Sequence, residues 1–174
     1  MFCDEKTKIV LEDALHPKFF PLFRKGVQIE IQSGISLYKL FHERWEIPLE
    51  YIHHRISSVF LDSHPVDDLE NTHIAGGMVL ALSSAMPGLV GAVMRRRLSL
   101  SSLRQSITYR EKTLPDLQHD GIITLKLFNL LVEELSEVFF RMGFRVRTED
   151  ARKVLPDGIH LPDKSYVIIA GSTP

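Results

Sequence analysis

The chain has 174 residues, of which 44% are hydrophobic and 25% are charged. These proportions are typical of a globular protein with one medium-sized domain, and they exclude a disordered or fibrous chain. The 21 basic and 22 acidic residues nearly cancel, so the protein has no overall field that would attract nucleic acid or a membrane surface, and such a partner would need a local patch.

The cysteine content and the apolar segments indicate the cellular compartment to expect. Cys3 is the single cysteine, which excludes an internal disulfide and a structural zinc site built on cysteines. The first residues include acids and no apolar signal segment, so we expect a cytoplasmic protein. The longest apolar run, 76–94, contains glycine, serine and proline, which weaken a transmembrane helix. We expect instead a buried strand that continues into a turn-rich loop.

The first third of the chain predicts helices around one clear strand. A lead-in of residues 1–17 contains a short helical stretch. Residues 18–32 offer two extended pieces around a turn at 24–26, and the second alternates apolar and polar residues from Val27 to Gln32, the period of a half-buried strand. Ser36 can cap the next helix. Its apolar residues have the spacing of one buried face: Leu37, Leu40, Phe41 and Trp45.

The middle of the chain predicts two strands and a turn. A short helical turn after Pro48 leads to a strand at 56–61, and the letters Asp62-Ser63-His64-Pro65 predict a turn. Residues 78–82 are almost continuously apolar, which indicates a strand in the centre of its sheet. Residues 95–112 then hold six bases against one acid, and this composition indicates an exposed basic connector.

The last third predicts one long helix and two strands. Residues 125–140 are apolar on most of a helical circumference, although the segment that leads into them can be extended, and Gly143 is a suitable stop. A strand at 144–148 follows, then a brief helix capped by Thr148 and a terminal strand. When the apolar face of a helix is wider than the core of its own domain can cover, it is usually buried against a second domain or subunit. We therefore expect a protein partner or a homo-oligomer.

The residues from 59 to 91 carry a family resemblance. They read VFLDSHPVDDLENTHIAGGMVLALSSAMPGLVG, and the informative positions are Leu61, Asp62, Val66, Asp67, Ile74, Gly76, Gly77, Val79, Ala81, Leu82, Pro87 and Gly88. This pattern resembles the C-terminal half of the small sulfur carriers of the ubiquitin-like β-grasp fold, namely the molybdopterin-synthase small subunit and the thiamine-pathway carrier. The resemblance implies an α+β protein with a β-grasp domain at 18–94, a basic connector at 95–119 and an appended helix and strand region at 120–174.

One feature of those carriers is missing here. The carriers end in a free diglycine whose carboxylate is adenylated and converted to a thiocarboxylate. In this chain Gly88 and Gly91 are internal, and more than 80 residues follow them. An internal amide cannot be adenylated, so a carrier function would require proteolysis after Gly88 or Gly91. Whether the C-terminal region is a separate domain or completes the sheet of the first one is left open by the sequence.

The sequence favours a non-catalytic protein-interaction or scaffolding module over an enzyme, with no cofactor. The resemblance links this module to sulfur or molybdopterin metabolism. Its interaction segment would be Met86, Pro87, Gly88, Leu89, Val90 and Gly91. A basic patch follows, at Arg95, Arg96, Arg97 and Arg104. The stretch Arg95–Lys112 could neutralise the phosphates of nucleic acid or anionic lipid, or it could be a solvated face.

The alternative is a small metal-dependent enzyme. Its ligands or acid–base groups would be His53, His64, Asp67 and His73, because imidazole and carboxylate oxygen are ordinary ligands of divalent metals. Neighbouring residues such as Asp67 and Asp68 point to opposite faces of a strand, however. No His-Glu-x-x-His helix is present either. The competing interpretation is that Asp62, Ser63 and Asp68 bind backbone N–H groups in turns.

Overall fold

The computed structural model describes residues 8–84, 108–109 and 119–172. In chain order, the strands are β1 (Lys8–Leu11), β2 (Val27–Gln32), β3 (Ile35–Ser36), β4 (Ser58–Leu61), β5 (His64–Pro65), β6 (His73–Ile74), β7 (Val79–Ser83), β8 (Asp120–Phe128), β9 (Phe144–Arg147) and β10 (Tyr166–Gly171). The helices are the 3₁₀-helix η2 (Asp13–Phe19), α1 (Phe20–Lys25), α2 (Leu37–Lys39), the π-helix η3 (Leu40–Arg44), α3 (Leu49–His54), α5 (Leu131–Met142) and α6 (Thr148–Arg152).

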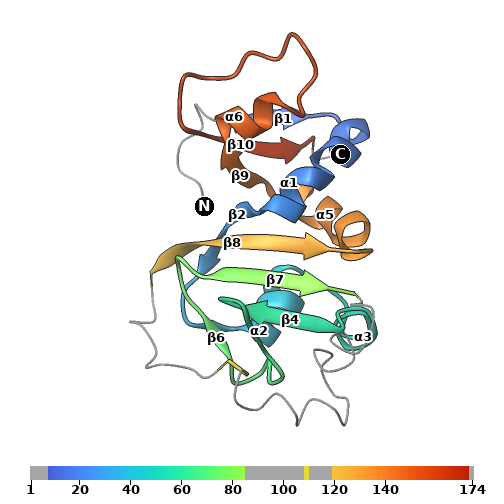
Figure 1. The fold of residues 1–174 in the computed structure, drawn as a ribbon, viewed down its shortest axis with the longest axis vertical. Coiled ribbons are helices and arrows are strands. Elements are labelled where there is room, and N and C mark those ends of the chain that lie inside the picture. Colours follow the sequence, from blue (N-terminus) through green and yellow to red (C-terminus); the bar gives the residue numbers. More distant parts are fainter. Residues whose placement is uncertain (1–7, 85–107, 110–118, 173–174) are drawn as a thin grey trace.

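Most of the described strands form one mixed sheet. Eight strands lie in the order β1-β10-β9-β2-β8-β7-β4-β5 within the described residues, and this order follows the long axis of the molecule (Figure 1). The pairs β1–β10 and β7–β8 are parallel, and the other neighbours are antiparallel. The fold is therefore mixed, with helices and one large sheet, as the predicted α+β class requires. Among the described helices, none has the length and apolar character needed to cross a membrane.

Strand β8 joins the two halves of the chain. It lies between β2 and β7, where Thr124 pairs with Gln28 on one side and with Val79 on the other. Strands β9 and β10 extend the same sheet beyond β2. The C-terminal strands therefore complete a sheet that also contains the strands from the segment 18–94.

The predicted extended piece before residue 24 is wrong, because Phe20–Lys25 is the helix α1. Pro21 lies in its first turn, where a missing N–H removes no intrahelical hydrogen bond. Leu22 and Phe23 are the buried residues of this helix. The chain then turns at Gly26, which has a φ of 125°, into the predicted strand β2. A helix followed by a strand thus replaces the hairpin that the resemblance implied at 18–32.

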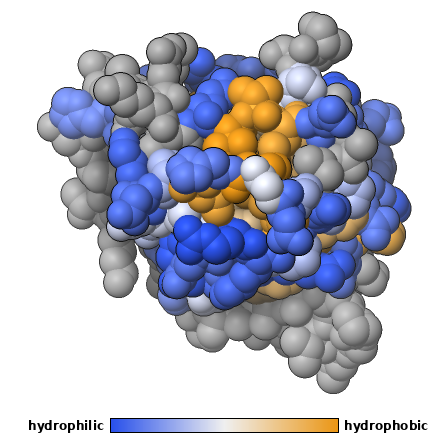
Figure 2. Space-filling view, turned by 90° about the horizontal axis from the view of Figure 1, so that it is seen from above, coloured by the Kyte–Doolittle hydropathy of each residue, from blue (hydrophilic) through white to orange (hydrophobic). Residues whose placement is uncertain are grey.

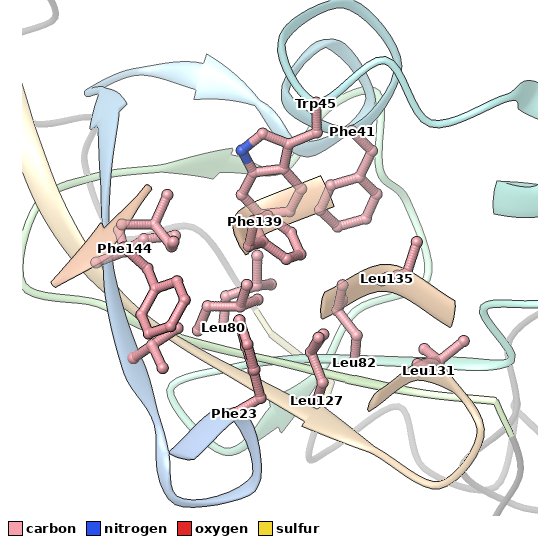
Figure 3. Packing of buried hydrophobic residues seen from close by; sticks show 14 of the residues in the cluster. Phe23, Phe41, Trp45, Leu80, Leu82, Leu127, Leu131, Leu135, Phe139 and Phe144 are labelled. Atoms are coloured by element: carbon pink, nitrogen blue, oxygen red, sulfur yellow. The ribbon is translucent and has the colours of Figure 1, made fainter. Parts of the chain in front are cut away.

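The helix predicted after Ser36 is confirmed. The Ser36 hydroxyl accepts a hydrogen bond from the Lys39 backbone N–H, and α2 continues into η3. Its predicted apolar face is fully in the core, where the ring of Trp45 stacks on Phe41 and meets Phe139 of α5 edge-on at 4.8 Å (Figure 3). In the same core, the ring centres of Phe23 of α1 and Phe144 of β9 lie 4.8 Å apart. Aromatic contacts therefore fix these elements against each other.

The long helix predicted at 125–140 is wrong in its first part. Residues 120–128 are strand β8, in which Ile123, Leu125 and Leu127 are fully buried while the residues between them are partly exposed. Asn129 has a φ of 56° and breaks the chain direction before α5 begins. The apolar residues of 125–140 were expected to surround one helix, but they belong to a strand and a helix. They therefore no longer support a subunit interface. The predicted stop at Gly143 is confirmed.

Two glycines allow β8 to enter the sheet beside the turn before β7. The backbones of Gly76 and Gly121 meet, and a Cβ on Gly121 would lie 2.8 Å from the Gly76 Cα and 2.6 Å from the Ser33 Oγ. The Gly76 N–H donates a hydrogen bond to that same Ser33 hydroxyl, at 3.2 Å. The contact therefore leaves no room for a side chain at position 121, the second residue of β8.

We expect Gly121→Ala to lower the free energy of unfolding by about 2 kcal/mol, because the added methyl group must displace backbone or Ser33. Gly77→Ala is the matched control. Gly77 has a φ of 87°, and a methyl group added there would have no atom within 4 Å, so this variant should lose only about 1 kcal/mol from backbone strain. Urea unfolding followed by circular dichroism measures both. Equal losses would contradict the close approach of the two backbones.

Candidate functional site

The four residues of the metal alternative do not converge. His53 is on α3, His64 on β5, Asp67 in the loop that follows and His73 on β6. Within residues 8–84, 108–109 and 119–172, no group of three or more His, Cys, Asp or Glu side chains is placed to hold a metal ion. The Nδ1 atom of His64 lies 2.8 Å from the Asp62 carbonyl oxygen, a contact within its own hairpin.

Two of the acids serve backbone geometry. Asp62 and Ser63 both have positive φ, 47° and 69°, and form the two-residue turn between β4 and β5. The Asp62 carboxylate accepts a hydrogen bond from the Val79 backbone N–H at 2.8 Å, so it ties this turn to β7. Asp68 accepts from the backbone N–H groups of Glu70 and Asn71. For Asp62 and Asp68, the interpretation as turn residues is confirmed.

The predicted interaction segment and basic patch lie outside the described residues. This holds for Met86–Gly91 and for Arg95, Arg96, Arg97 and Arg104. From the predicted basic connector at 95–119 the structure describes Thr108, Tyr109 and His119. The Tyr109 N–H donates a hydrogen bond to the Pro65 carbonyl oxygen at 2.9 Å, beside the edge strand β5.

The described residues do form a cationic cleft, on the polar face of β8, β2 and β9. Gln28 of β2 is the direct cross-strand neighbour of Thr124 on β8 and of Arg145 on β9. Alternation along each strand places these three side chains on one face of the sheet. They line a cavity of about 210 Å³, which the C-terminal end of α1, the start of α6 and Tyr166 of β10 complete.

Two groups in this cleft have unused hydrogen-bonding capacity. The guanidinium carbon of Arg145 lies 4.4 Å from the centre of the Tyr166 ring, a cation–π contact. No hydrogen bond or ion pair joins the Arg145 side chain to the rest of the described chain. The Oε1 atom of Gln28 is buried and accepts no hydrogen bond from any described residue. Within the described residues, the Arg145 guanidinium and the Gln28 Oε1 atom therefore both lack a polar partner.

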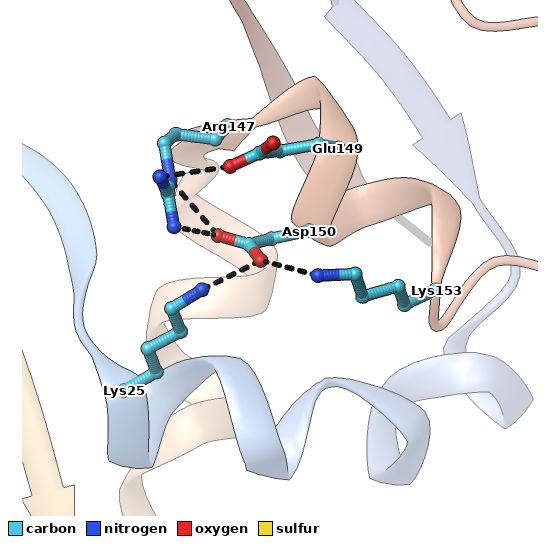
Figure 4. Close-up of polar contacts among 5 residues, drawn as sticks. All are labelled: Lys25, Arg147, Glu149, Asp150 and Lys153. Carbon is cyan, nitrogen blue, oxygen red and sulfur yellow. Dashed lines mark hydrogen bonds and ion pairs between the residues drawn. The ribbon is translucent and has the colours of Figure 1, made fainter.

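The rim of the cleft is held by Asp150, the buried acid of α6 (Figure 4). Its carboxylate lies 2.6 Å from the Lys25 Nζ of α1, 2.9 Å from an Arg147 nitrogen and 3.4 Å from the Lys153 Nζ. Glu149 also contacts Arg147, at 2.7 Å. Since Lys25 precedes β2 and Arg147 ends β9, this cluster fixes α1 against the C-terminal strands.

Hydrogen bonding from Lys25 lowers the pKa of Asp150 to about 2, with burial acting in the opposite direction and Arg147 adding to the lowering. The acid is therefore ionised throughout the neutral range and serves as a fixed negative charge. Its role is to orient cations, because a carboxylate with so low a pKa is a poor general acid or base near pH 7.

Two other cavities differ from the cleft in the charge of their lining residues. One of about 400 Å³ shares Arg147 and Tyr166 with it and adds both bases and acids, among them Arg152 and Asp163. Another, of about 580 Å³, lies at the other end of β2 and holds two bases and two acids together with His73. The cleft at Gln28 has three cations, Lys25, Arg145 and Arg147, against one acid. This excess makes it the stronger candidate for an anion.

A second polar cluster, partly exposed, joins α3 to α5. Tyr51 donates a hydrogen bond to Glu134, which also binds the Arg55 guanidinium. Burial and the Glu134 hydrogen bond raise the pKa of Tyr51, and the Arg55 hydrogen bond lowers the pKa of Glu134. All three side chains are satisfied by each other, so this cluster is structural.

Sequence reasoning missed the cleft. The period of two in Phe-Arg-Val-Arg could have placed Arg145 and Arg147 on one face of their strand. Their position beside Gln28 depends on the pairing of β2 with β9, which are more than 110 residues apart, and no local signal gives that register. Thr148, predicted as a cap, instead donates its hydroxyl hydrogen bond to the Lys164 carbonyl, and Arg147 is the capping residue.

Comparison with known proteins found no match to this chain among protein-family models, curated sequences or solved structures.

We expect Asp150→Asn to flatten the acid dependence of stability. Because the pKa of Asp150 is lower in the folded protein than its ordinary value of 3.8, its contribution is complete above about pH 4 and is lost as the pH falls towards 2. The lost contribution should be on the order of 1–2 kcal/mol, since its partners are half exposed and screened.

Urea unfolding at several pH values from 2 to 5 measures this difference. The matched control is Asp157→Asn, at an exposed aspartate outside the cluster, which should keep the wild-type profile. If the free energy of unfolding of the Asp150 variant falls as much as that of the wild type between pH 5 and pH 2, the cluster does not stabilise the ionised form of Asp150.

Proposed function

We propose that this protein is a non-catalytic protein-interaction module of the β-grasp type, whose partner pairs with the sheet at β1. The resemblance of residues 59–91 to sulfur carriers supports the β-grasp assignment and a link to sulfur or molybdopterin metabolism. In the same segment, Leu61 ends a strand, Asp62 begins the turn and Val79 begins the apolar strand β7, in keeping with the turns and strands that the resemblance implies there.

The observation that carries the proposal is an open sheet edge at β1. Only one side of β1 is paired among the described residues, through its parallel register with β10. An edge strand exposes unpaired N–H and C=O groups that can bind a strand of another chain. The opposite edge, β5, has two residues, contains Pro65 and is contacted by the Tyr109 N–H, so it is a poor site for strand addition.

Side chains at the same end of the molecule are suited to a protein contact. Figure 2 looks onto the end that carries β1, β10 and α6 and shows a group of apolar residues surrounded by polar ones. Val10 of β1 is 57% exposed. An apolar centre with a polar rim is the usual composition of a protein interface.

A second copy of the chain is the partner that this edge fits most simply. Two β1 strands related by a two-fold axis pair antiparallel, and each then satisfies the free edge of the other. The contact extends the sheet across the dimer axis. Because β1 has four residues, the interface is short and the dimer should be weak, with a dissociation constant on the order of micromolar.

Val10→Asp tests this interface. We expect it to raise the dimer dissociation constant at least tenfold, because each subunit would bring an uncompensated carboxylate into the contact. The matched control is Leu130→Asp, at a residue 50% exposed just before α5. Sedimentation equilibrium over a range of protein concentrations measures both variants. A monomeric wild type at several hundred micromolar, or equal effects of the two variants, would contradict the proposal.

A further inference from the structure

The side chain of Trp45 lines a cavity that neither the β1 interface nor the cationic cleft uses. This cavity, of about 520 Å³, lies beside the second half of β2, beyond the pairing of Gln28 with β9. Besides Trp45, its walls come from β2, η3, the first residue of β8 and the last residue of α5. Its size is within the range of cavities that bind small organic molecules.

The indole nitrogen of Trp45 is a hydrogen-bond donor without a partner. Trp45 is 2% exposed, and a tryptophan buried to this extent normally donates its N–H group to an acceptor. No hydrogen bond joins this N–H group to the part of the chain that the structure describes. Among the described side chains, Gln28 Oε1 is the one fully enclosed nitrogen or oxygen atom without a partner. The Trp45 nitrogen is therefore unpartnered but not enclosed.

The packing of the ring directs this N–H group towards the cavity. The indole stacks on Phe41, and Phe139 meets it edge-on. Figure 3 shows the indole nitrogen on the edge of the ring that points away from Phe41. Because the core encloses almost all of the ring, the small accessible part of Trp45 lies in the cavity that it lines. An acceptor in the cavity can therefore bind the N–H group.

Two unusual backbone features hold Trp45 in this position. Residues Leu40–Arg44 form a π-helix, which the Trp45 backbone N–H closes by donating to the Leu40 carbonyl oxygen at 3.0 Å. Glu46 then has a φ of 53°, a conformation that is uncommon for residues other than glycine. Short π-helical turns are frequent at functional sites, and residues with strained backbone cluster there as well. The local conformation thus favours a binding role for Trp45.

The charges around the cavity favour a neutral acceptor. Glu30 and Asp120 bring two carboxylates to its lining, against one guanidinium from Arg44. Arg44 already donates a hydrogen bond to the side-chain oxygen of Gln32 at 2.8 Å. An anionic ligand would be repelled by this excess of negative charge. The carbonyl oxygen of a carboxamide accepts a hydrogen bond without carrying a charge, and its NH₂ group is a donor, which suits a cavity rich in carboxylates.

From these features we propose that this cavity binds a small neutral carboxamide, whose carbonyl oxygen accepts a hydrogen bond from the Trp45 indole N–H. Met142 lines the same cavity and is 49% exposed, so it offers an apolar, adaptable surface to the rest of the ligand. The cavity shares no lining residue with the cationic cleft and includes no residue of β1. This site is therefore independent of the proposed dimer interface.

The test uses Trp45 itself as the probe, because the chain has a single tryptophan and therefore a single indole N–H signal in a proton–nitrogen NMR spectrum. The full-length protein is titrated at constant ionic strength with isobutyramide and with isobutyrate, which have the same size and differ in charge. We expect isobutyramide to shift the indole proton downfield in a saturable way and to bind about tenfold more tightly than isobutyrate. No saturable shift with isobutyramide, or equal affinity for the two compounds, overturns the proposal.

Two variants assign the binding to its residues. Trp45→Phe removes the donor and keeps an aromatic ring in the core, and it should weaken isobutyramide binding about tenfold, as followed by the backbone amide of Met142. Asp120→Asn leaves the core intact and should tighten isobutyrate binding about threefold. Asp157→Asn is its control, at an exposed aspartate that does not line the cavity. Full isobutyramide affinity in folded Trp45→Phe, or equal isobutyrate affinities of the two aspartate variants, would also overturn the proposal.

Discussion

The position of β8 between β2 and β7 is the constraint on which the rest of the structure depends. Strand β8 pairs antiparallel with β2 and parallel with β7, and the contact of Gly76 with Gly121 allows its first residues to reach the sheet. Without β8, no strand pairing would join β2 to β7, β4 and β5. The alternate residues of β8 then serve two surfaces. Ile123, Leu125 and Leu127 fill the aromatic core, while Thr124 faces the cationic cleft.

The same constraint positions the polar groups of the cleft. Because β2 lies between β8 and β9, Gln28 has Thr124 on one side and Arg145 on the other. Asp150 then holds Lys25 and Arg147 at the rim through a buried carboxylate. Ion pairs of this kind contribute modestly to stability when their cations are exposed. Their larger effect is to fix α1 and α6 beside Arg145, the cation that Asp150 does not bind.

Patterns of neighbouring residues correctly predicted several helices and strands. The alternation of Val27–Gln32, the apolar face from Leu37 to Trp45 and the stop at Gly143 are all confirmed. The signals failed where two elements share one apolar run, as at 120–142, since an apolar stretch alone does not separate a strand from a helix. They also failed at Phe20–Lys25, where the apolar residues around Pro21 suggest an edge strand and in fact form a helix. The cleft could not be predicted, because Gln28 and Arg145 meet only through the register of strands distant in sequence.

The most direct test of the account is a set of interstrand nuclear Overhauser effects from Thr124 in the full-length protein. If β8 lies between β2 and β7, the backbone protons of Thr124 show contacts both to Gln28 and to Val79, which are its partners in register. Contacts between β2 and β7 themselves, with none from Thr124 to either strand, would show that residues 18–84 form a sheet on their own. That result would contradict both the fold and the position of the cleft.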